Sequence, residues 1–102
     1  MSGFFVLIME YCVYILHSEI LSRFYTGYTS NLDVRIAFHE NPESRKFTYN
    51  ADDWIVFLKI DCKSQKQAMA IEKHVKQMKS SVYINNLKKY PEMVEKLLDK
   101  YK

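Results

Sequence analysis

Residues 11–29 read YCVYILHSEILSRFYTGYT, and this segment predicts a β-hairpin. Residues 11–17 are β-branched, aromatic and almost wholly apolar, which is typical of a strand covered on both faces. A polar loop, residues 18–23, follows, and residues 24–29 predict the returning strand. Gly27 inside this second strand indicates either a β-bulge or a close approach by another group.

One helix and one further strand are expected after the hairpin. Leu32 is predicted to begin the helix, with Ser30 or Asn31 as its cap, and Asp33 suits its first turn. Residue Asn41 precedes Pro42, which predicts the end of that helix. The next expected elements are a polar loop, residues 43–53, and a third strand, residues 54–60.

The C-terminal part of the chain predicts three helices. Ser64 and Gln67 have the spacing of a capping box, and Pro91 suits the first turn of the last helix. The expected inward positions are Ala68, Ile71, Val75 and Met78 in one helix, and Val94, Leu97, Leu98 and Tyr101 in the last, with a short helix over 81–89 between them. The predicted order is ββαβααα, an α/β domain in which helices flank a three-stranded, mainly antiparallel sheet.

The composition is that of one folded domain. The chain has 102 residues, 48% of them hydrophobic and 26% charged, and disorder needs fewer apolar residues and a higher net charge. We expect a single domain over residues 9–102, with residues 1–8 as an extension or a short strand. The apolar stretch from Phe4 to Leu16 contains Glu10 and is too short for a hydrocarbon core about 30 Å thick, so no membrane association is expected.

Cysteine and histidine spacing predicts neither a disulfide framework nor a zinc site. Two cysteines cannot staple a domain of this size, which makes the reducing cytoplasm the expected location. The residues concerned are Cys12, Cys62, His17, His39 and His74, and none shows the spacing of zinc ligands.

Charge is distributed unevenly along the chain. Residues 1–58 contain four basic and seven acidic side chains, whereas residues 59–102 contain eleven basic and five acidic ones. A basic half favours a polyanionic partner, because bound cations release counterions from it. The alternative is a solvated lysine-rich face. Between Asp61 and Glu92 the only acid is Glu72, among Lys63, Lys66, Lys73, Lys76, Lys79, Lys88 and Lys89.

Glu72 is expected at the edge of the apolar stripe of its helix, near Ala68 and Val75. One interpretation is an ion pair with Lys76 at spacing i, i+4, which contributes about 0.2–0.5 kcal/mol. The other is a ligand for Mg²⁺, which prefers hard oxygens, keeps several waters and often takes only one or two protein carboxylates beside substrate phosphates. The residues leave both interpretations open.

Arg35 and His39 share a helix face with the apolar Leu32 and Ile36. Arginine in such a place either extends its guanidinium into water along a packed stem, or holds phosphate oxygens with its planar fork. His39, one turn later, suits proton transfer or phosphate binding.

Tyr14 and Tyr25 lie on the two strands of the predicted hairpin, where their hydroxyls can approach a common site. The alternative is simple packing, which is the usual role of tyrosine in strands. No Gly-rich phosphate loop, Ser-His-Asp arrangement or carboxylate pair accompanies them, so P-loop enzymes, nucleophile-elbow hydrolases and most glycosidases are excluded.

Taken together, these motifs resemble the GIY-YIG nuclease domain. The order is Cys12-Val13-Tyr14, then Tyr25-Thr26-Gly27, then Ser30-Asn31-Leu32 leading to Arg35 and His39, then Glu72 on a lysine-rich helix. The resemblance covers residues 11–86 and is nearest to the small stand-alone bacterial members. It departs from the family pattern at Cys12, Val13, Thr26 and Tyr28, which replace a glycine, two isoleucines and, in some members, a lysine.

The resemblance implies hydrolysis of DNA phosphodiesters by water with one divalent metal, Mg²⁺ or Mn²⁺. By position, Tyr14 matches the candidate general base and Tyr25 matches the tyrosine that orients water or phosphate. Arg35 matches the residue that holds the scissile phosphate, His39 a helper in proton transfer, and Glu72 the metal ligand. Arg35 and the metal are expected to lower the pKa of Tyr14 from about 10. A late asparagine of the family corresponds to Asn85 or Asn86.

The leading hypothesis is therefore a divalent-metal-dependent DNA endonuclease of low sequence specificity, with no recognition module attached and a role in DNA repair or a related process. Single-stranded and branched DNA are included among its substrates, and Lys73, Lys76 and Lys79 are expected to contact phosphates. The alternatives are a non-catalytic nucleic-acid-binding domain with the same fold, and a structural protein with a solvated lysine face. The oligomeric state stays open.

Overall fold

The structure, a computed structural model, describes residues 10–40 and 51–102. The expectations for residues 1–8, and for most of the loop at 43–53, lie outside these residues. The element order is ββαβααα, as predicted. The elements are β1 (Tyr11–Ser18), β2 (Arg23–Thr29), α1 (Leu32–Glu40), β3 (Ile55–Cys62), α2 (Gln65–Met78), α3 (Ser81–Lys89) and α4 (Pro91–Lys100).

The three strands form one antiparallel sheet in the order β2-β1-β3. β1 is central, and all five residues from Cys12 to Leu16 are buried, as its apolar composition predicts for a strand covered on both faces. The pairing of β1 with β2 is regular through Gly27, so this glycine marks no bulge. The register instead shifts between β1 and β3, at Ile15 and Leu16.

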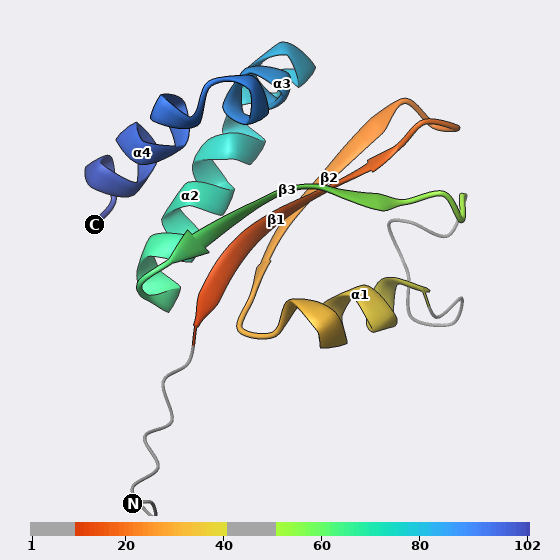
Figure 1. The fold of residues 1–102 in the computed structure, drawn as a ribbon, viewed down its shortest axis with the longest axis horizontal. Coiled ribbons are helices and arrows are strands. Elements are labelled where there is room, and N and C mark those ends of the chain that lie inside the picture. The colour runs from red at the N-terminus through yellow and green to blue at the C-terminus, as the bar shows by residue number, and fades with distance from the viewer. Residues whose placement is uncertain (1–9, 41–50) are drawn as a thin grey trace, which may run out of the picture.

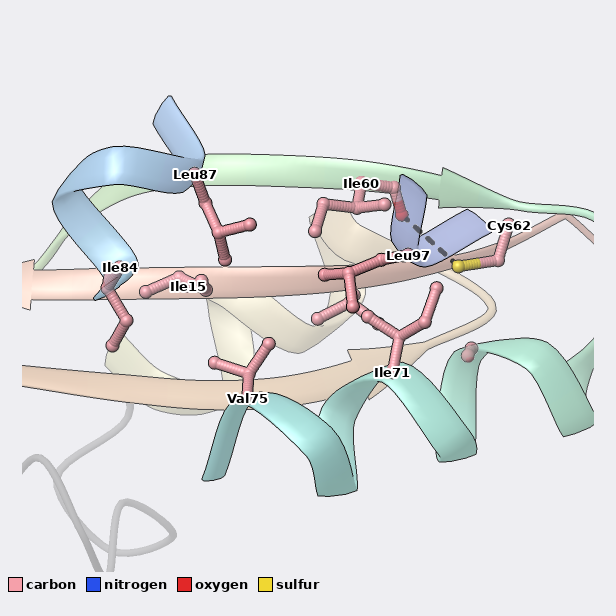
Figure 2. Packing of buried hydrophobic residues seen from close by; sticks show 10 residues of the cluster. Ile15, Ile60, Cys62, Ile71, Val75, Ile84, Leu87 and Leu97 are labelled. Carbon is pink, nitrogen blue, oxygen red and sulfur yellow. Dashed lines mark hydrogen bonds between the residues drawn. The ribbon is translucent and has the colours of Figure 1, made fainter. Parts of the chain in front are cut away.

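Helices cover the two faces of the sheet unequally, as Figure 1 shows: α2, α3 and α4 lie on one side and α1 on the other. The main core fills the space between the sheet and the three C-terminal helices (Figure 2). Alternate β1 residues therefore face different layers. The core contains Val13, Ile15, Ile60, Cys62, Ala68, Ile71, Val75, Ile84, Leu87 and Leu97.

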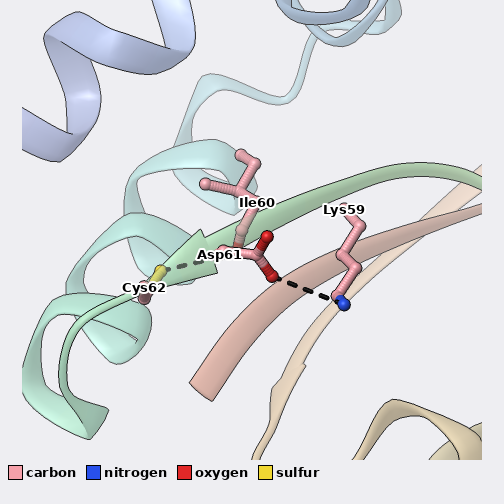
Figure 3. A network of polar contacts seen from close by, with 4 residues as sticks. All are labelled: Lys59, Ile60, Asp61 and Cys62. Carbon is pink, nitrogen blue, oxygen red and sulfur yellow. Dashed lines mark hydrogen bonds and ion pairs between the residues drawn. The ribbon is translucent and has the colours of Figure 1, made fainter. Parts of the chain in front are cut away.

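The end of β3 shows the same alternation (Figure 3). Ile60 and Cys62 are buried in the core, whereas Lys59 and Asp61 are exposed on the other face and form an ion pair of 3.4 Å. The Cys62 thiol donates to the Ile60 carbonyl at 3.6 Å. At this end of β3, a period of two thus separates the polar residues from the face covered by α2, α3 and α4.

Side-chain caps begin three of the helices, and those of α1 and α2 were predicted. Asn31, one of the two expected caps of α1, accepts from the Val34 amide at 3.2 Å. Ser64 accepts from the Gln67 amide at 3.1 Å, as the capping box predicts. The reciprocal half of the box is wrong, because the Gln67 side chain accepts from the Lys63 amide at 2.7 Å instead of the Ser64 amide, and donates to the Leu98 carbonyl at 2.9 Å.

Met78 is a second correction. It was expected to complete the inward stripe of α2, but 44% of it is exposed. Met78 is the last residue of α2, and Lys79 after it adopts a left-handed conformation that ends the helix. The other expected inward positions of α2 and α4 do contact the core, with Leu97 buried and Val94, Leu98 and Tyr101 partly buried.

The turn between β1 and β2 is tied to the segment that precedes β3. Ser18 donates to Asp53 at 2.6 Å, and the Ile20 amide donates to the other carboxylate oxygen at 2.9 Å. These hydrogen bonds lower the pKa of the Asp53 carboxyl, the bond from Ser18 most of all. Within the described residues, no helix has the length and apolar character needed to cross a membrane.

Candidate active site

Tyr14 lies in the middle of the central strand and is only 1% exposed. It is paired with Gly27 of β2. A Cβ placed on Gly27 would lie 2.5 Å from the Tyr14 hydroxyl oxygen and 2.7 Å from its Cζ. Gly27 has a negative φ, so its missing side chain makes room for the ring and does not serve a special backbone conformation. This is the close approach that the sequence indicated.

Tyr25 is the diagonal neighbour of Tyr14 on the same face of the hairpin. It is paired with Leu16, two residues beyond Tyr14, and diagonal positions are within reach of aromatic side chains. The two ring centroids are 6.2 Å apart and the rings are tilted by 35°. A hydrogen bond joins the two side chains. The expected approach of the two phenols is therefore present.

The electrostatic surroundings of Tyr14 connect it with two other candidate residues. Burial raises its pKa most, followed by the neighbouring Tyr25; Arg35 lowers it, and the charge of Glu72 raises it further. Arg35 lowers the pKa as expected, but desolvation outweighs it, so the net direction without a metal is upward.

Arg35 comes from α1, which lies on the opposite side of the sheet from α2 (Figure 1). Tyr14 faces this side, because it alternates with Val13 and Ile15, which face the main core. Its amide donates to the Asn31 carbonyl at 3.1 Å, in the first turn of the helix that Asn31 caps. Arg35 is half-buried, as expected for a guanidinium on a packed stem. His39 is on the same helix, but its side chain lies outside the described residues.

Glu72 comes from α2, on the other side of the sheet. Its side chain is 21% exposed and forms an ion pair with Lys76 at 3.6 Å, which is the i, i+4 contact that the sequence offered as one interpretation. Glu72 also lines a depression of about 370 Å³ together with Tyr28 of β2. The carboxylate is thus half-sheltered at the edge of the sheet and reachable from solvent.

Lysines surround this carboxylate. Lys73, Lys76 and Lys79 line the same depression and are exposed. Of the two candidate asparagines, Asn85 is exposed and donates to the Ser81 carbonyl of its own helix at 2.8 Å, while Asn86 is half-buried. Lys73, Lys76 and Lys79 therefore form a cationic rim around the Glu72 carboxylate, on the helix where the sequence places them.

The donor set suits a hard cation that keeps much of its water. Among residues 10–40 and 51–102, no group of three His, Cys, Asp or Glu side chains converges as a metal cage would require. Glu72 is a single, accessible carboxylate, and Mg²⁺ is commonly held by one or two carboxylates plus substrate phosphates. The residues therefore fit a cation shared with a phosphate, and they do not fit a structural zinc site.

Tyr28 and Arg23 are residues at this edge to which the sequence reasoning assigned no role. Tyr28 lines the depression beside Glu72, and Arg23 lines a neighbouring pocket with Tyr25. A signal for Tyr28 was present, because alternation along β2 places it on the opposite face from Gly27 and hence toward α2. Nothing in the sequence places Arg23 next to α2.

A three-stranded antiparallel sheet with helices on both sides, and two hairpin tyrosines in contact, are the features that the resemblance to a nuclease domain implies. The model of the GIY-YIG catalytic domain matches residues 10–89 of this chain. The chain belongs to the GIY-YIG family, a family of nucleases. Neither the curated proteins nor the solved structures contain a match.

Proposed function

We propose that this protein is a divalent-metal-dependent endonuclease that hydrolyses DNA phosphodiester bonds. One observation supports this most: the hairpin that brings the rings of Tyr14 and Tyr25 together also contributes Tyr28 to the hollow in which the accessible Glu72 carboxylate lies among lysines. A packed core has no need of an accessible carboxylate among lysines beside this hairpin. Phosphoryl transfer does, because it depends mostly on positioning and on stabilising charge.

Each residue has a role that its surroundings support. Arg35 binds the scissile phosphate and offsets its developing charge, since a guanidinium matches phosphate oxygens. Glu72 holds the metal, which supplies Lewis-acid stabilisation when bound. Tyr14 is protonated at neutral pH because its pKa is raised, so in the free protein it orients water by hydrogen bonding together with Tyr25. It acts as a base only where added positive charge favours the phenolate.

Low sequence specificity follows from the side chains at the rim. Lysines contact phosphates, which position a nucleic acid but carry no sequence information. Lys73, Lys76 and Lys79 supply such contacts beside Glu72. The arrangement predicts affinity that falls steeply with salt concentration, because phosphate contacts release counterions.

A cleavage assay tests the proposal. Labelled single-stranded, duplex and branched DNA are incubated with protein in Mg²⁺, in Mn²⁺ or in EDTA, beside Glu72→Gln and Arg35→Ala variants whose folding is checked by circular dichroism. Glu95→Gln on α4 is the matched control, since it removes an exposed acid outside the site. Cleavage that requires metal, Glu72 and Arg35 but not Glu95 supports the nuclease.

Two other outcomes would contradict it. Salt-sensitive DNA binding without cleavage by the unmodified protein indicates a nucleic-acid-binding domain that retains the fold. Absence of both binding and cleavage indicates that the lysines form only a solvated face.

A further inference from the structure

A second pocket lies beside the proposed cleavage site, along the exposed edge of β2. Its volume is about 510 Å³, within the range of roughly 300–1,000 Å³ typical of ligand pockets. It lies between the start of β2, the end of α2 and the beginning of α3. Lys76 and Lys79 line both this pocket and the depression that contains Glu72. The two hollows therefore adjoin each other.

The charge of this pocket is positive throughout. Arg23, Lys76 and Lys79 line it, and no carboxylate is among its lining residues. All three cationic residues are exposed and reachable by a phosphate chain, although Lys76 is also paired with Glu72. An anionic ligand is what this charge complements.

The interior of the pocket is apolar and aromatic, which the binding of phosphates alone does not require. Val75 and Ile84, both buried core residues, form part of its lining, together with the aromatic residues Phe24 and Tyr25. Paired bases inside a duplex keep their faces stacked, whereas an unpaired base offers its face to aromatic and apolar side chains. A cationic rim over an apolar, aromatic interior is how proteins bind single-stranded nucleic acid.

We infer that this pocket, lined by Arg23, Tyr25 and Ser81, holds an unpaired nucleotide of the DNA strand next to the scissile phosphate. The inference rests on the proposed function, because it assumes that the neighbouring phosphate is the one cleaved. It narrows the substrate to DNA with an unpaired segment at the cleavage site. Tyr25 connects the two regions, because it contacts Tyr14 on one side and lines the pocket on the other.

Binding measurements test this without relying on cleavage. Fluorescence anisotropy compares a fully paired duplex with the same duplex carrying an unpaired tail, using the Glu72→Gln protein so that the DNA stays intact. Ser81→Leu fills part of the pocket with a side chain that cannot stack. Its matched control is Val82→Leu, the next residue of α3, which is 68% exposed and outside the pocket lining.

We expect Ser81→Leu to weaken binding of the tailed DNA by about tenfold, the order of one lost base-stacking contact, and to change binding of the paired duplex less than twofold. Arg23→Ala should show the same preference for affecting tailed DNA, with Lys96→Ala on α4 as the control. Equal loss for both DNAs, no loss for either, or no binding at all overturns the inference. If the unmodified protein discriminates tails but never cleaves DNA, the proposed function fails and the pocket assignment stands.

Discussion

The hydroxyl of Tyr14 occupies the space that a side chain on Gly27 would fill, with 2.5 Å between its oxygen and the position of a Cβ. The two residues face each other across β1 and β2. The Tyr14 phenol, to which the family pattern assigns a chemical role, therefore fits in this position because Gly27 on the neighbouring strand has no side chain. This makes the glycine a packing requirement of the site.

Gly27→Ala should therefore be costly. The added methyl group meets both the hydroxyl and the Cζ of Tyr14, and overpacking of a buried site costs about 1–3 kcal/mol of unfolding free energy. Urea denaturation followed by circular dichroism measures this. In a Tyr14→Leu background the same substitution should cost clearly less, because the ring is gone. An equal cost in both backgrounds would show that the ring is not the obstacle.

Replacing Lys76 with methionine should strengthen binding of Mg²⁺ or Mn²⁺. The Lys76 ammonium lies 3.6 Å from the Glu72 carboxylate and competes with a cation for it. A pair of this kind contributes about 0.2–0.5 kcal/mol, so its loss alone should tighten metal binding about twofold, and removal of the positive charge should add to this. Isothermal titration calorimetry without DNA provides the measurement.

Lys66→Met is the control for that experiment, because Lys66 is also exposed on α2 but lines none of the described hollows beside Glu72. If Lys66→Met and Lys76→Met change metal affinity equally, the local ion pair is not responsible. Weaker binding in Lys76→Met would contradict the competition directly.

His74 should make stability depend on pH on the acid side. Burial, and to a lesser degree the charge of Lys100, lowers its pKa from 6.5, and its Nδ1 is 2.9 Å from the Tyr101 hydroxyl. The folded protein therefore favours the neutral ring. This stabilisation is complete above pH 6.5 and is lost as the pH falls toward the lowered pKa, because the unfolded chain binds the proton more readily.

Thermal melts between pH 8 and pH 5 check this expectation. The melting temperature should fall over that range, and the fall should be smaller in His74→Gln, which no longer titrates. Lys100→Ala should reduce the fall slightly, since it removes a nearby positive charge. An identical pH profile for His74→Gln and the unmodified protein would assign the dependence to other groups.

Two apolar positions of the α2 stripe, Ile71 and Met78, should differ sharply on truncation. Ile71 is fully buried in the core (Figure 2), so Ile71→Ala should destabilise the fold by about 2–5 kcal/mol. Met78 is largely exposed, so Met78→Ala should lie within about 0.5 kcal/mol of the unmodified protein. Chemical denaturation measures both values. A comparable loss at Met78 would mean that this residue contacts the core after all.

Much of the fold follows from local signals. The run at 11–17 and its partner at 24–29 mark the hairpin because β-branched and aromatic residues suit a covered sheet, and Asn31 and Ser64 mark helix starts because their side chains satisfy free amides. The expected order of candidate residues along the chain is likewise a property of the sequence. These features depend on neighbours within a few positions, where the period of the backbone decides the outcome.

Contacts between distant segments required the tertiary structure. The Gln67 side chain bonds the Lys63 amide and the Leu98 carbonyl instead of the Ser64 amide, because α4 brings that carbonyl within its reach. The pKa of Tyr14 is raised because burial in the fold desolvates its hydroxyl, and this effect exceeds the lowering by Arg35. Arg23 meets the end of α2 only once β2 lies at the sheet edge. Periodicity along one element determines which face is apolar, but which groups meet across elements depends on packing, and packing is set by all the elements at once.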